Sequence, residues 1–296
     1  MDVSIIIVNY NTIKVLLTAI ASIVEKCNGF SYEIIIVDNN SSDNSQNILT
    51  ERYSDKVKLL YLSENIGFGR ANNEGIKIAK GRNVIFLNPD IQLIDNSIKI
   101  LSDYLDSHSN VGIVGGNLYT PDLKPGYSYN RFLPGIFTEE FSMLTFGLIR
   151  KLIPNLYHNL SNKSLEVGCI SGADMMIRRE LLEKVGCFDP QFFMYYEDTE
   201  LSWRVKKAGY KLVNVPKAKM IHLDSQSFNS KEDKLRMSLT SRVKYLEKVK
   251  GKKYRLIADR IYLLALNMHI VLFKLLRKNV RYYVQIRGLI KELWFS

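Results

Sequence analysis

The sequence predicts an α/β protein whose sheet is mostly parallel, open and flanked by helices, in a Rossmann-like arrangement. Short apolar, β-branched runs alternate with helix-length segments through the first half of the chain. Strands that are apolar along their whole length are typical of parallel sheets covered on both faces. The chain has 296 residues, of which 46% are hydrophobic, so it can bury a full core and is not a disordered protein.

The predicted elements follow one another in a regular order. The expected strands are Val3–Val8, Glu33–Val37, Val57–Leu62, Asn83–Leu87 and Val111–Gly115, and the expected helices are Ile13–Lys26, Asp43–Arg52, Arg70–Ala79 and Asn96–Ser107. Further along, order returns at Val167–Arg179, and a strand is expected at Leu212–Val215. Parallel strands need such long connections, so the alternation itself supports the parallel sheet.

The segment from Thr120 to Asn162 interrupts this order. It loses strand periodicity and contains four prolines, Pro121, Pro125, Pro134 and Pro154. We predict a long loop with a short apolar helix over Phe137–Leu152. Long irregular segments in compact domains are commonly lids or binding loops.

Positive charge is concentrated in the C-terminal tail. Of the formal net charge of +11, residues 248–296 carry twelve Lys or Arg against Asp259 and Glu292, which gives +10 and leaves 29 basic and 28 acidic side chains in the body. The uncharged run Ile261–Phe273 has thirteen residues, whereas a membrane-spanning helix needs about 20. The pattern favours an interfacial helix on anionic lipid with aromatic anchors, namely Tyr282, Tyr283, Trp294 and Phe295. The alternative is a helical hairpin that packs on the body or forms a dimer.

The cysteines and the N-terminus indicate a cytoplasmic protein. Cys27, Cys169 and Cys187 are widely spaced and form no metal or redox pattern, so they are expected to be free thiols in a reducing compartment. The first apolar run is short and leads into Asn9, as a buried strand would, without a cleavable leader pattern.

Polar clusters follow three of the predicted strands, at Asn9-Tyr10-Asn11, at 38–43 and at Asn88-Pro89-Asp90. In open α/β sheets ligands bind beyond the carboxyl ends of the strands, so these clusters predict a site at one edge. Asn and Asp are also ordinary turn and cap residues, which is the alternative for each cluster alone. Nearby, Gly67 and Gly69 either let the backbone approach a phosphate or sugar, or form a tight helix entry.

A pair of carboxylates, Glu197 and Asp198, follows an aromatic run and begins a predicted helix. Aromatic side chains exclude water, and a carboxylate in such a setting can become a useful base. Because a helix N-terminus also favours negative charge, a capping role is the alternative.

Taken together, these motifs resemble those of the family 2 glycosyltransferases with the GT-A fold, particularly the rhamnosyltransferase-like branch. The matching motifs are Ile7–Asn11, Val37–Asp43, Asn65–Phe68, Asn88–Asp90, Ser171–Asp174, Gly186–Asp189 and Phe193–Asp198. The resemblance covers about residues 3 to 228. It implies a glycosyltransferase domain over 1–228, with a nucleotide-sugar-binding half at 1–118 and an acceptor and catalytic half at 163–228. A helical basic extension follows at 229–296.

The resemblance also implies the residues of the donor site. Those expected to bind the nucleotide are Val8, Asn9, Tyr10, Asp38, Asn40, Asn65, Gly67, Asn88 and Asp90, with Asp38 reaching the base. Asn88-Pro89-Asp90 stands where the family usually has Asp-x-Asp, so Asp90 would bind the Mg²⁺ or Mn²⁺ that neutralises the diphosphate. Asn88 departs from the stricter motif. His222 would be a second metal ligand, suited to Mn²⁺, or an incidental histidine.

By the same resemblance, Asp198 would be the catalytic base of an inverting transfer, deprotonating the acceptor hydroxyl. Glu197 would orient the acceptor or tune its neighbour, because close carboxylates push their pKa values apart. Asp174 and Trp203 would line the acceptor side, with loop stabilisation as the alternative role of Asp174.

The implied reaction moves one sugar, in the first instance from dTDP-L-rhamnose, to a lipid-linked surface glycan at the inner face of the cell membrane. UDP-hexoses and UDP-galactofuranose are the alternative donors. The sequence lacks the Gln-x-x-Arg-Trp motif and the several long apolar helices of processive synthases, which favours single addition.

Two other classes of protein were considered. The presence of Asp38, Asp90 and Asp198 together argues against an inactive sugar-binding module. The excess of basic residues is confined to the tail, which argues against a nucleic-acid-binding protein. Oligomerisation is left open.

Overall fold

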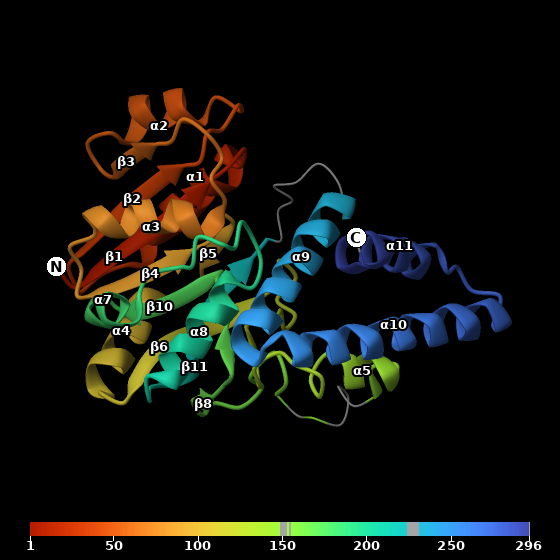
Figure 1. Ribbon diagram of the computed structural model, residues 1–296. Helices are drawn as coiled ribbons and strands as arrows, with labels where there is room; N and C mark the ends of the chain where they lie inside the picture. Colours follow the sequence, from red (N-terminus) through yellow and green to blue (C-terminus); the bar gives the residue numbers. More distant parts are fainter. Residues whose placement is uncertain (149–152, 154, 224–230, 296) are drawn as a thin grey trace.

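The computed structural model in Figure 1 describes residues 1–148, 153, 155–223 and 231–295. In these residues the main sheet consists of β1 (Val3–Asn9), β2 (Tyr32–Asp38), β3 (Lys58–Tyr61), β4 (Asn83–Leu87), β5 (Ile91–Leu93), β6 (Val111–Tyr119), β8 (Leu165–Glu166), β10 (Asp174–Arg178) and β11 (Lys211–His222). A second, two-stranded sheet pairs β7 (Tyr129–Asn130) with β9 (Cys169–Ile170). The order in the main sheet is β3-β2-β1-β4-β10-β6-β11-β5, with β8 paired to β11.

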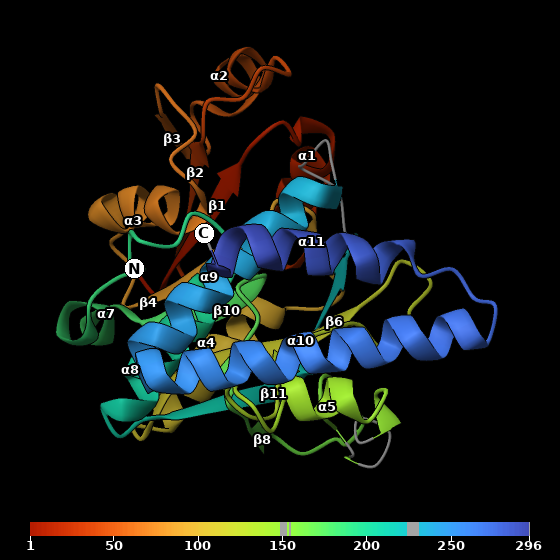
Figure 2. The same cartoon turned by 45° about the vertical axis from the view of Figure 1, so that its right-hand side comes forward.

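The helices fall into two groups. Those around the sheet are α1 (Ile13–Lys26), α2 (Ser45–Tyr53), α3 (Phe68–Ile78), α4 (Ser97–Ser107), α7 (Arg179–Val185) and α8 (Glu197–Lys207). Beside them lie α5 (Glu140–Leu144) and three C-terminal helices, α9 (Lys231–Lys250), α10 (Lys252–Leu275) and α11 (Arg281–Phe295). Figures 1 and 2 show the C-terminal helices along one side of the molecule, with α5 beside α10.

The strands that the sequence predicts pair mostly in parallel. β1 pairs in parallel with β2 and β4, β2 with β3, and β6 with β11. Between β4 and β6 lies β10, which is antiparallel to both. β10 falls within the predicted ordered segment 167–179, but an apolar run does not reveal strand direction, so its place in the sheet was not predicted.

Both faces of the sheet are covered, because successive side chains of a strand point to opposite faces. Ile5 and Ile7 of β1 belong to a core cluster with α1, α2 and α4. Ile6 and Val8 belong to a second cluster with α3, α7 and α8. The continuous apolar run of β1 is therefore explained by burial on both sides.

Several predicted bounds differ from the observed ones. β11 continues seven residues beyond Val215 and contains Pro216. Its pairing with β6 shifts register between Asn214 and Lys219, and such irregularities accommodate a proline that cannot donate a hydrogen bond. α5 covers only 140–144 of the predicted helix at 137–152. Residues 149–152 and the predicted domain boundary at 228 lie outside the described residues.

The C-terminal helices are joined to the body by a buried ionic cluster around Arg242 of α9. Its guanidinium contacts Glu140 of α5, and it lies 3.0 Å from Asp259 Oδ1 of α10. The rings of Tyr262 and Trp294 flank it at 5.1 and 5.2 Å. Arg242, Glu140 and Asp259 are all buried. One cation therefore links α5, α9 and α10, which shows that the helical extension packs on the body.

Candidate active site

A cavity of about 230 Å³ opens at the carboxyl ends of β1 and β4. Seven predicted site residues line it, namely Val8, Tyr10, Asn65, Gly67, Asn88, Asp90 and His222. They come from four separate stretches of the chain, which the parallel strands bring to one edge. This is the edge at which open α/β sheets bind ligands.

Asn9 and Asp38 lie at the ends of β1 and β2 but are fully buried and do not line the cavity. Asn9 Nδ2 donates to Asp38 Oδ2 at 2.7 Å and to Ser41 Oγ at 3.0 Å. Asp38 Oδ1 accepts from the Ser41 N–H and from Gln46 Nε2, both at 3.0 Å. These bonds hold the turn after β2 against β1. Asn40 of that turn is exposed and also lies outside the cavity.

Asn39, rather than Asn40, faces the cavity. Its Nδ2 donates to Asn65 Oδ1 at 2.8 Å, and its Oδ1 accepts from the Ile66 N–H at 3.0 Å. Gly67 has a φ of 89°, and a Cβ there would lie 2.4 Å from the carbonyl oxygen of Phe193. The glycine thus allows the entry of α3 to touch the chain that leads to α8, which supports the tight helix entry that we considered for it.

Asp90 and His222 are brought together from the ends of β4 and β11. His222 Nε2 lies 3.3 Å from Asp90 Oδ1 and 3.5 Å from Asn88 Nδ2. The described part of the chain contains no group of three or more His, Cys, Asp or Glu side chains that could hold a metal ion. One carboxylate and one imidazole fit a divalent cation that takes its remaining ligands from phosphate and water.

Asp198 is half-buried at the start of α8 and is held by backbone donors. Its Oδ2 accepts from the Gly172 N–H at 2.8 Å, and its Oδ1 accepts from the Thr199 N–H at 2.6 Å. Because β10 is antiparallel to β4, with Asp174 opposite Leu87, Gly172 lies at the carboxyl end of β4. Asp198 is therefore at the same sheet edge as the cavity.

The two carboxyl groups differ in their electrostatics. Burial raises the pKa of Asp198, although its hydrogen bonds to Gly172 and Thr199 oppose this shift. Burial and the charge of Asp198 raise the pKa of Glu197 to about 8. With its pKa raised to about 8, Glu197 favours its protonated form at neutral pH. A carboxylate whose pKa is raised, as that of Asp198 is, becomes a stronger general base.

The segment before α8 has an unusual backbone. Tyr195 and Tyr196 have φ values of 68° and 65°, which are uncommon for residues other than glycine. The Ser241 hydroxyl of α9 donates to the Met194 carbonyl at 2.7 Å, and the Tyr196 hydroxyl donates to Glu139 Oε1 at 2.7 Å. Contacts from the C-terminal helices and from the α5 region therefore fix the position of the carboxylate pair.

The structure does not bring the two predicted acceptor residues into the cavity. Asp174 is fully buried, accepts from the Gly116 N–H at 2.6 Å, and burial raises its pKa to about 7. Trp203 lies on α8, where the Lys207 ammonium is 5.1 Å from its ring. Five residues along a helix turn a side chain by about 140°, so Trp203 faces away from Asp198.

Sequence reasoning missed several cavity residues. Asn39 is adjacent to Asp38, and Tyr195 precedes Glu197 by two positions, so their motifs were the available signal. Lys234 of α9 also lines the cavity and brings positive charge to it. It is 144 positions from Asp90 in the sequence (234 − 90), and no local pattern marks it.

Comparison with known proteins identifies the class of enzyme. The profile described as Glycosyl transferase family 2 matches residues 4–186, and the profile described as Glycosyl transferase family group 2 matches residues 138–294. The chain belongs to glycosyl transferase family 2, and it is a glycosyltransferase. The resemblance noted from the sequence motifs is confirmed.

Among characterised relatives, rhamnosyltransferases are prominent. The N-acetylglucosaminyl-diphospho-decaprenol L-rhamnosyltransferase of Mycobacterium tuberculosis is 30% identical over 215 residues, which cover 66% of this chain and 67% of the relative. Rhamnosyltransferase WbbL of Escherichia coli is 27% identical over 226 residues, covering 73% and 82%. The low-salt glycan biosynthesis hexosyltransferase Agl10 of Haloferax volcanii is 28% identical over 240 residues, covering 77% and 70%.

Solved structures confirm the GT-A fold. The mannosyltransferase PcManGT of Pyrobaculum calidifontis, in complex with GDP-Man and Mn²⁺, aligns with a TM-score of 0.64 at 15% identity. That alignment covers 99% of this chain and 87% of the other. GalNAc-T7 with UDP, GalNAc and Mn²⁺ gives a TM-score of 0.60 at 16% identity, covering 83% and 48%.

Proposed function

We propose that this enzyme moves one sugar, with inversion, from a nucleotide diphosphate sugar to a hydroxyl of a lipid-linked glycan. One observation carries the proposal. The Asp90–His222 pair and the carboxylate of Asp198 lie at the same edge of the sheet. The names of the rhamnosyltransferase relatives support dTDP-L-rhamnose as the donor, and that of the mycobacterial relative supports a sugar on a lipid diphosphate as the acceptor. The hexosyltransferase relative keeps UDP-hexoses, with UDP-galactofuranose, as alternative donors.

In the proposed reaction the acceptor oxygen attacks the anomeric carbon of the sugar from the side opposite the diphosphate. The bond to the acceptor oxygen forms as the bond to the diphosphate oxygen breaks, and Asp198 takes the hydroxyl proton. The nucleoside diphosphate leaves with the electron pair. Asp90 and His222 would hold a divalent cation, Mg²⁺ or Mn²⁺, which when bound neutralises the diphosphate. Lys234 would add a second positive charge there.

Thermal unfolding with nucleotide sugars tests this function. We expect dTDP-L-rhamnose with Mg²⁺ or Mn²⁺ to raise the Tm, because a ligand that binds only the folded state stabilises it by about 2.7 kcal/mol at 100 times its Kd. EDTA should reduce the shift, and UDP-sugars should give smaller ones. An Asp90→Asn variant should lose the metal-dependent part. A larger shift with UDP-sugars would refute the proposed donor, and no shift with any nucleotide sugar would refute the function.

We also propose that α10 lies on an anionic membrane at the cytoplasmic face. The exposed apolar residues Ile257, Leu264, Met268, Val271 and Leu275 are spaced by seven, four, three and four positions, so they form one stripe along the helix. Arg260 and Lys274 lie on one side of this apolar stripe. An apolar stripe bordered by basic residues is typical of helices that lie in the membrane interface.

The described residues contain one helix, α10, that is long and apolar enough to cross a membrane by length and composition. Its inner side, however, packs on the protein. Ala258, Ala265, Leu266 and Ile270 are buried, and Asp259 pairs with Arg242. A helix with one packed side and one exposed apolar side supports an interfacial position.

Substitution of the stripe tests membrane binding. We expect Ile257→Ser, Leu264→Ser and Val271→Ser together to lower partitioning onto anionic vesicles by about tenfold or more, since each large apolar side chain contributes about 1.5–3 kcal/mol when fully buried. Val24→Ser, Leu123→Ser and Leu160→Ser together are the matched control, because these side chains are also exposed but lie on the body. Equal partitioning of the two triple variants, measured by co-sedimentation, would contradict the proposal.

A further inference from the structure

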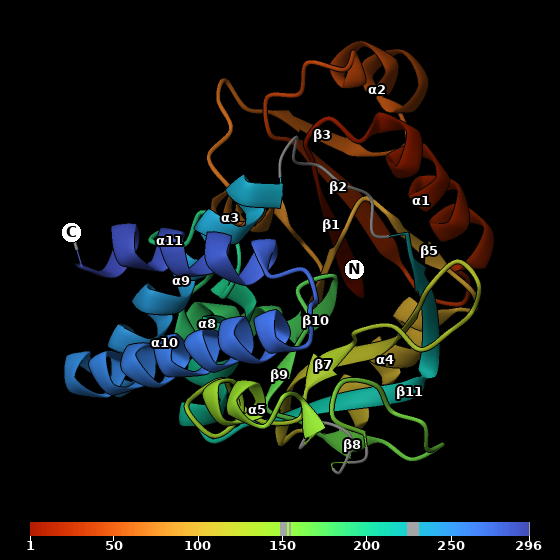
Figure 3. The same cartoon turned by 90° about the vertical axis from the view of Figure 1, so that its right-hand side faces the viewer.

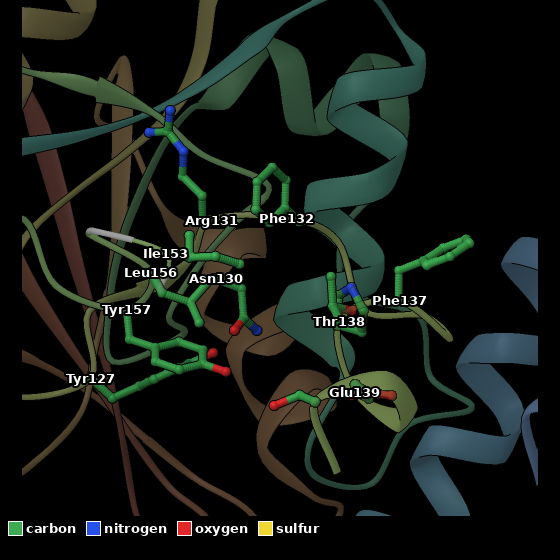
Figure 4. A pocket seen from close by; sticks show the side chains of 12 residues that line it. Tyr127, Asn130, Arg131, Phe132, Phe137, Thr138, Glu139, Ile153, Leu156 and Tyr157 are labelled. Carbon is green, nitrogen blue, oxygen red and sulfur yellow. The ribbon is translucent and has the colours of Figure 1, made fainter. Parts of the chain in front are cut away.

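A second and larger cavity of about 760 Å³ lies in the segment between β6 and β8, which the sequence predicts to be a long loop with a short apolar helix. Its walls are mostly apolar and aromatic, and Figure 4 shows Phe132, Leu156 and the rings of Tyr127 and Tyr157 around it. The centroids of the two tyrosine rings are 5.6 Å apart. Cavities of this kind, with a few polar groups on apolar walls, are typical of small-molecule sites.

The polar groups of the cavity converge. Figure 4 shows the hydroxyls of Tyr127 and Tyr157, the amide of Asn130 and the carboxylate of Glu139 directed toward the same space. The Tyr127 hydroxyl and the Asn130 side-chain amide form no hydrogen bond with the rest of the described chain. A ligand with hydroxyl groups could bond to both. Sugar rings combine such hydroxyls with an apolar face that packs on aromatic rings.

The cavity is close to Asp198. Tyr127, which lines the cavity, also lines a smaller cavity of about 100 Å³ together with Ser171 and His222. The backbone also places the cavity near Asp198. The Ser171 N–H donates to the Ser128 carbonyl at 3.2 Å, and the N–H of the next residue, Gly172, donates to Asp198.

The cavity is also close to α10. The Ile136 N–H donates to the Tyr254 hydroxyl oxygen of α10 at 2.8 Å, and a Cβ at Gly135 would lie 2.8 Å from the same oxygen. Figure 3 shows α5, which follows this segment, beside α10. The cavity therefore lies between the segment that holds Asp198 and the helix α10, which carries the apolar stripe.

We propose that this cavity binds the terminal sugar ring of the acceptor. Tyr127, Asn130 and Glu139 form hydrogen bonds with its hydroxyls, and Tyr157 and Phe132 pack on its apolar face. The ring then presents a hydroxyl to Asp198, while the lipid portion extends toward α10. This inference rests on the proposed function and names the chemical class that the acceptor site recognises, a pyranose sugar.

Chemical modification of Asn130→Cys tests the site in a protein that is already folded. Treatment with N-ethylmaleimide places a bulky group in the cavity. With a short-chain N-acetylglucosaminyl-diphospho-lipid as the acceptor probe, the modified variant should lose transfer relative to the same variant untreated. Wild type treated identically is the control for Cys187, which is only partly buried, and for the buried Cys27 and Cys169. The donor-induced rise in Tm should persist in the modified variant.

A second variant gives an independent measure. Tyr127→Phe removes one hydrogen-bonding group and should raise the KM for the acceptor probe by about three- to tenfold, with smaller changes in kcat and in the donor KM. Tyr53→Phe on α2 is its matched control. Undiminished transfer by modified Asn130→Cys would overturn the inference while leaving the proposed function intact. If wild type neither binds nor consumes any nucleotide sugar, the proposed function fails and the inference fails with it.

Discussion

Replacement of Asp198 by Asn is expected to lower the rate of sugar transfer by about 10²- to 10⁴-fold, the usual contribution of a general base. The amide cannot accept the hydroxyl proton, and the loss should appear in kcat. Donor binding should survive, because Asp198 does not line the 230 Å³ cavity. The measurement is single-turnover transfer, combined with the donor-induced shift in Tm to show that the variant is folded and loaded.

Glu197→Gln is the matched comparison, since it makes the same chemical change one residue away. Glu197 has a pKa of about 8 and favours its protonated form at neutral pH, so the amide preserves its charge state. The expected loss at pH 7 is about tenfold or less, the equivalent of one hydrogen bond. Equal losses in the two variants, or near-normal turnover by Asp198→Asn, would contradict the assignment of Asp198 as the base.

Replacement of Arg242 by Met is expected to destabilise the protein by about 3–5 kcal/mol, the usual cost of removing one partner of a buried ion pair. The substitution leaves Glu140 as a buried carboxylate without its cation, while Asp259 keeps only Arg255, at 2.9 Å. Desolvation already raises the pKa of Glu140 against the effect of Arg242, so the loss of the cation should favour its protonation. The measurement is chemical denaturation, read as the midpoint and the free energy of unfolding.

Arg236→Met on the same helix is the control. Arg236 pairs with Glu292 at 2.7 Å on the surface, and exposed pairs contribute little, so its midpoint should match that of wild type. Adding Glu140→Gln to Arg242→Met should recover part of the lost stability, because position 140 then carries no unpaired buried charge and Asp259 keeps its pair with Arg255. Equal midpoints for Arg242→Met and Arg236→Met would show that the cluster does not hold the C-terminal helices in place.

The architecture was predictable because the strands of the parallel part are apolar throughout and their polar ends mark one sheet edge. α1 lies where its pattern predicts, and seven predicted residues line the 230 Å³ cavity. Side-chain direction was less predictable. Asp38 and Asn39 are adjacent, yet only Asn39 faces the cavity, because Asp38 ends a strand with its side chain bonded to Asn9.

Other features depend on distant packing. The antiparallel insertion of β10, the presence of Lys234 in the cavity and the second cavity at Tyr127 arise from contacts between remote segments, and no local pattern encodes them. The position of Trp203 is different. Helical periodicity alone places it about 140° from Asp198, so the sequence already contained the information that it faces away.

The ionic cluster at Arg242 also bears on how the enzyme can be modified. A shortened chain ending at Lys250 would lose Asp259, and with it the Tyr254 hydroxyl that bonds to Ile136, so the tail is not a removable anchor. The same holds for chimeras between relatives. A tail from another enzyme would carry side chains that pair with that enzyme's own α5. The exchange should therefore include α5, with Glu140, as well as the tail. α5 and the C-terminal helices are distant in the sequence but depend on each other. A crossover point between α5 and α10 would separate the residues that pair across them.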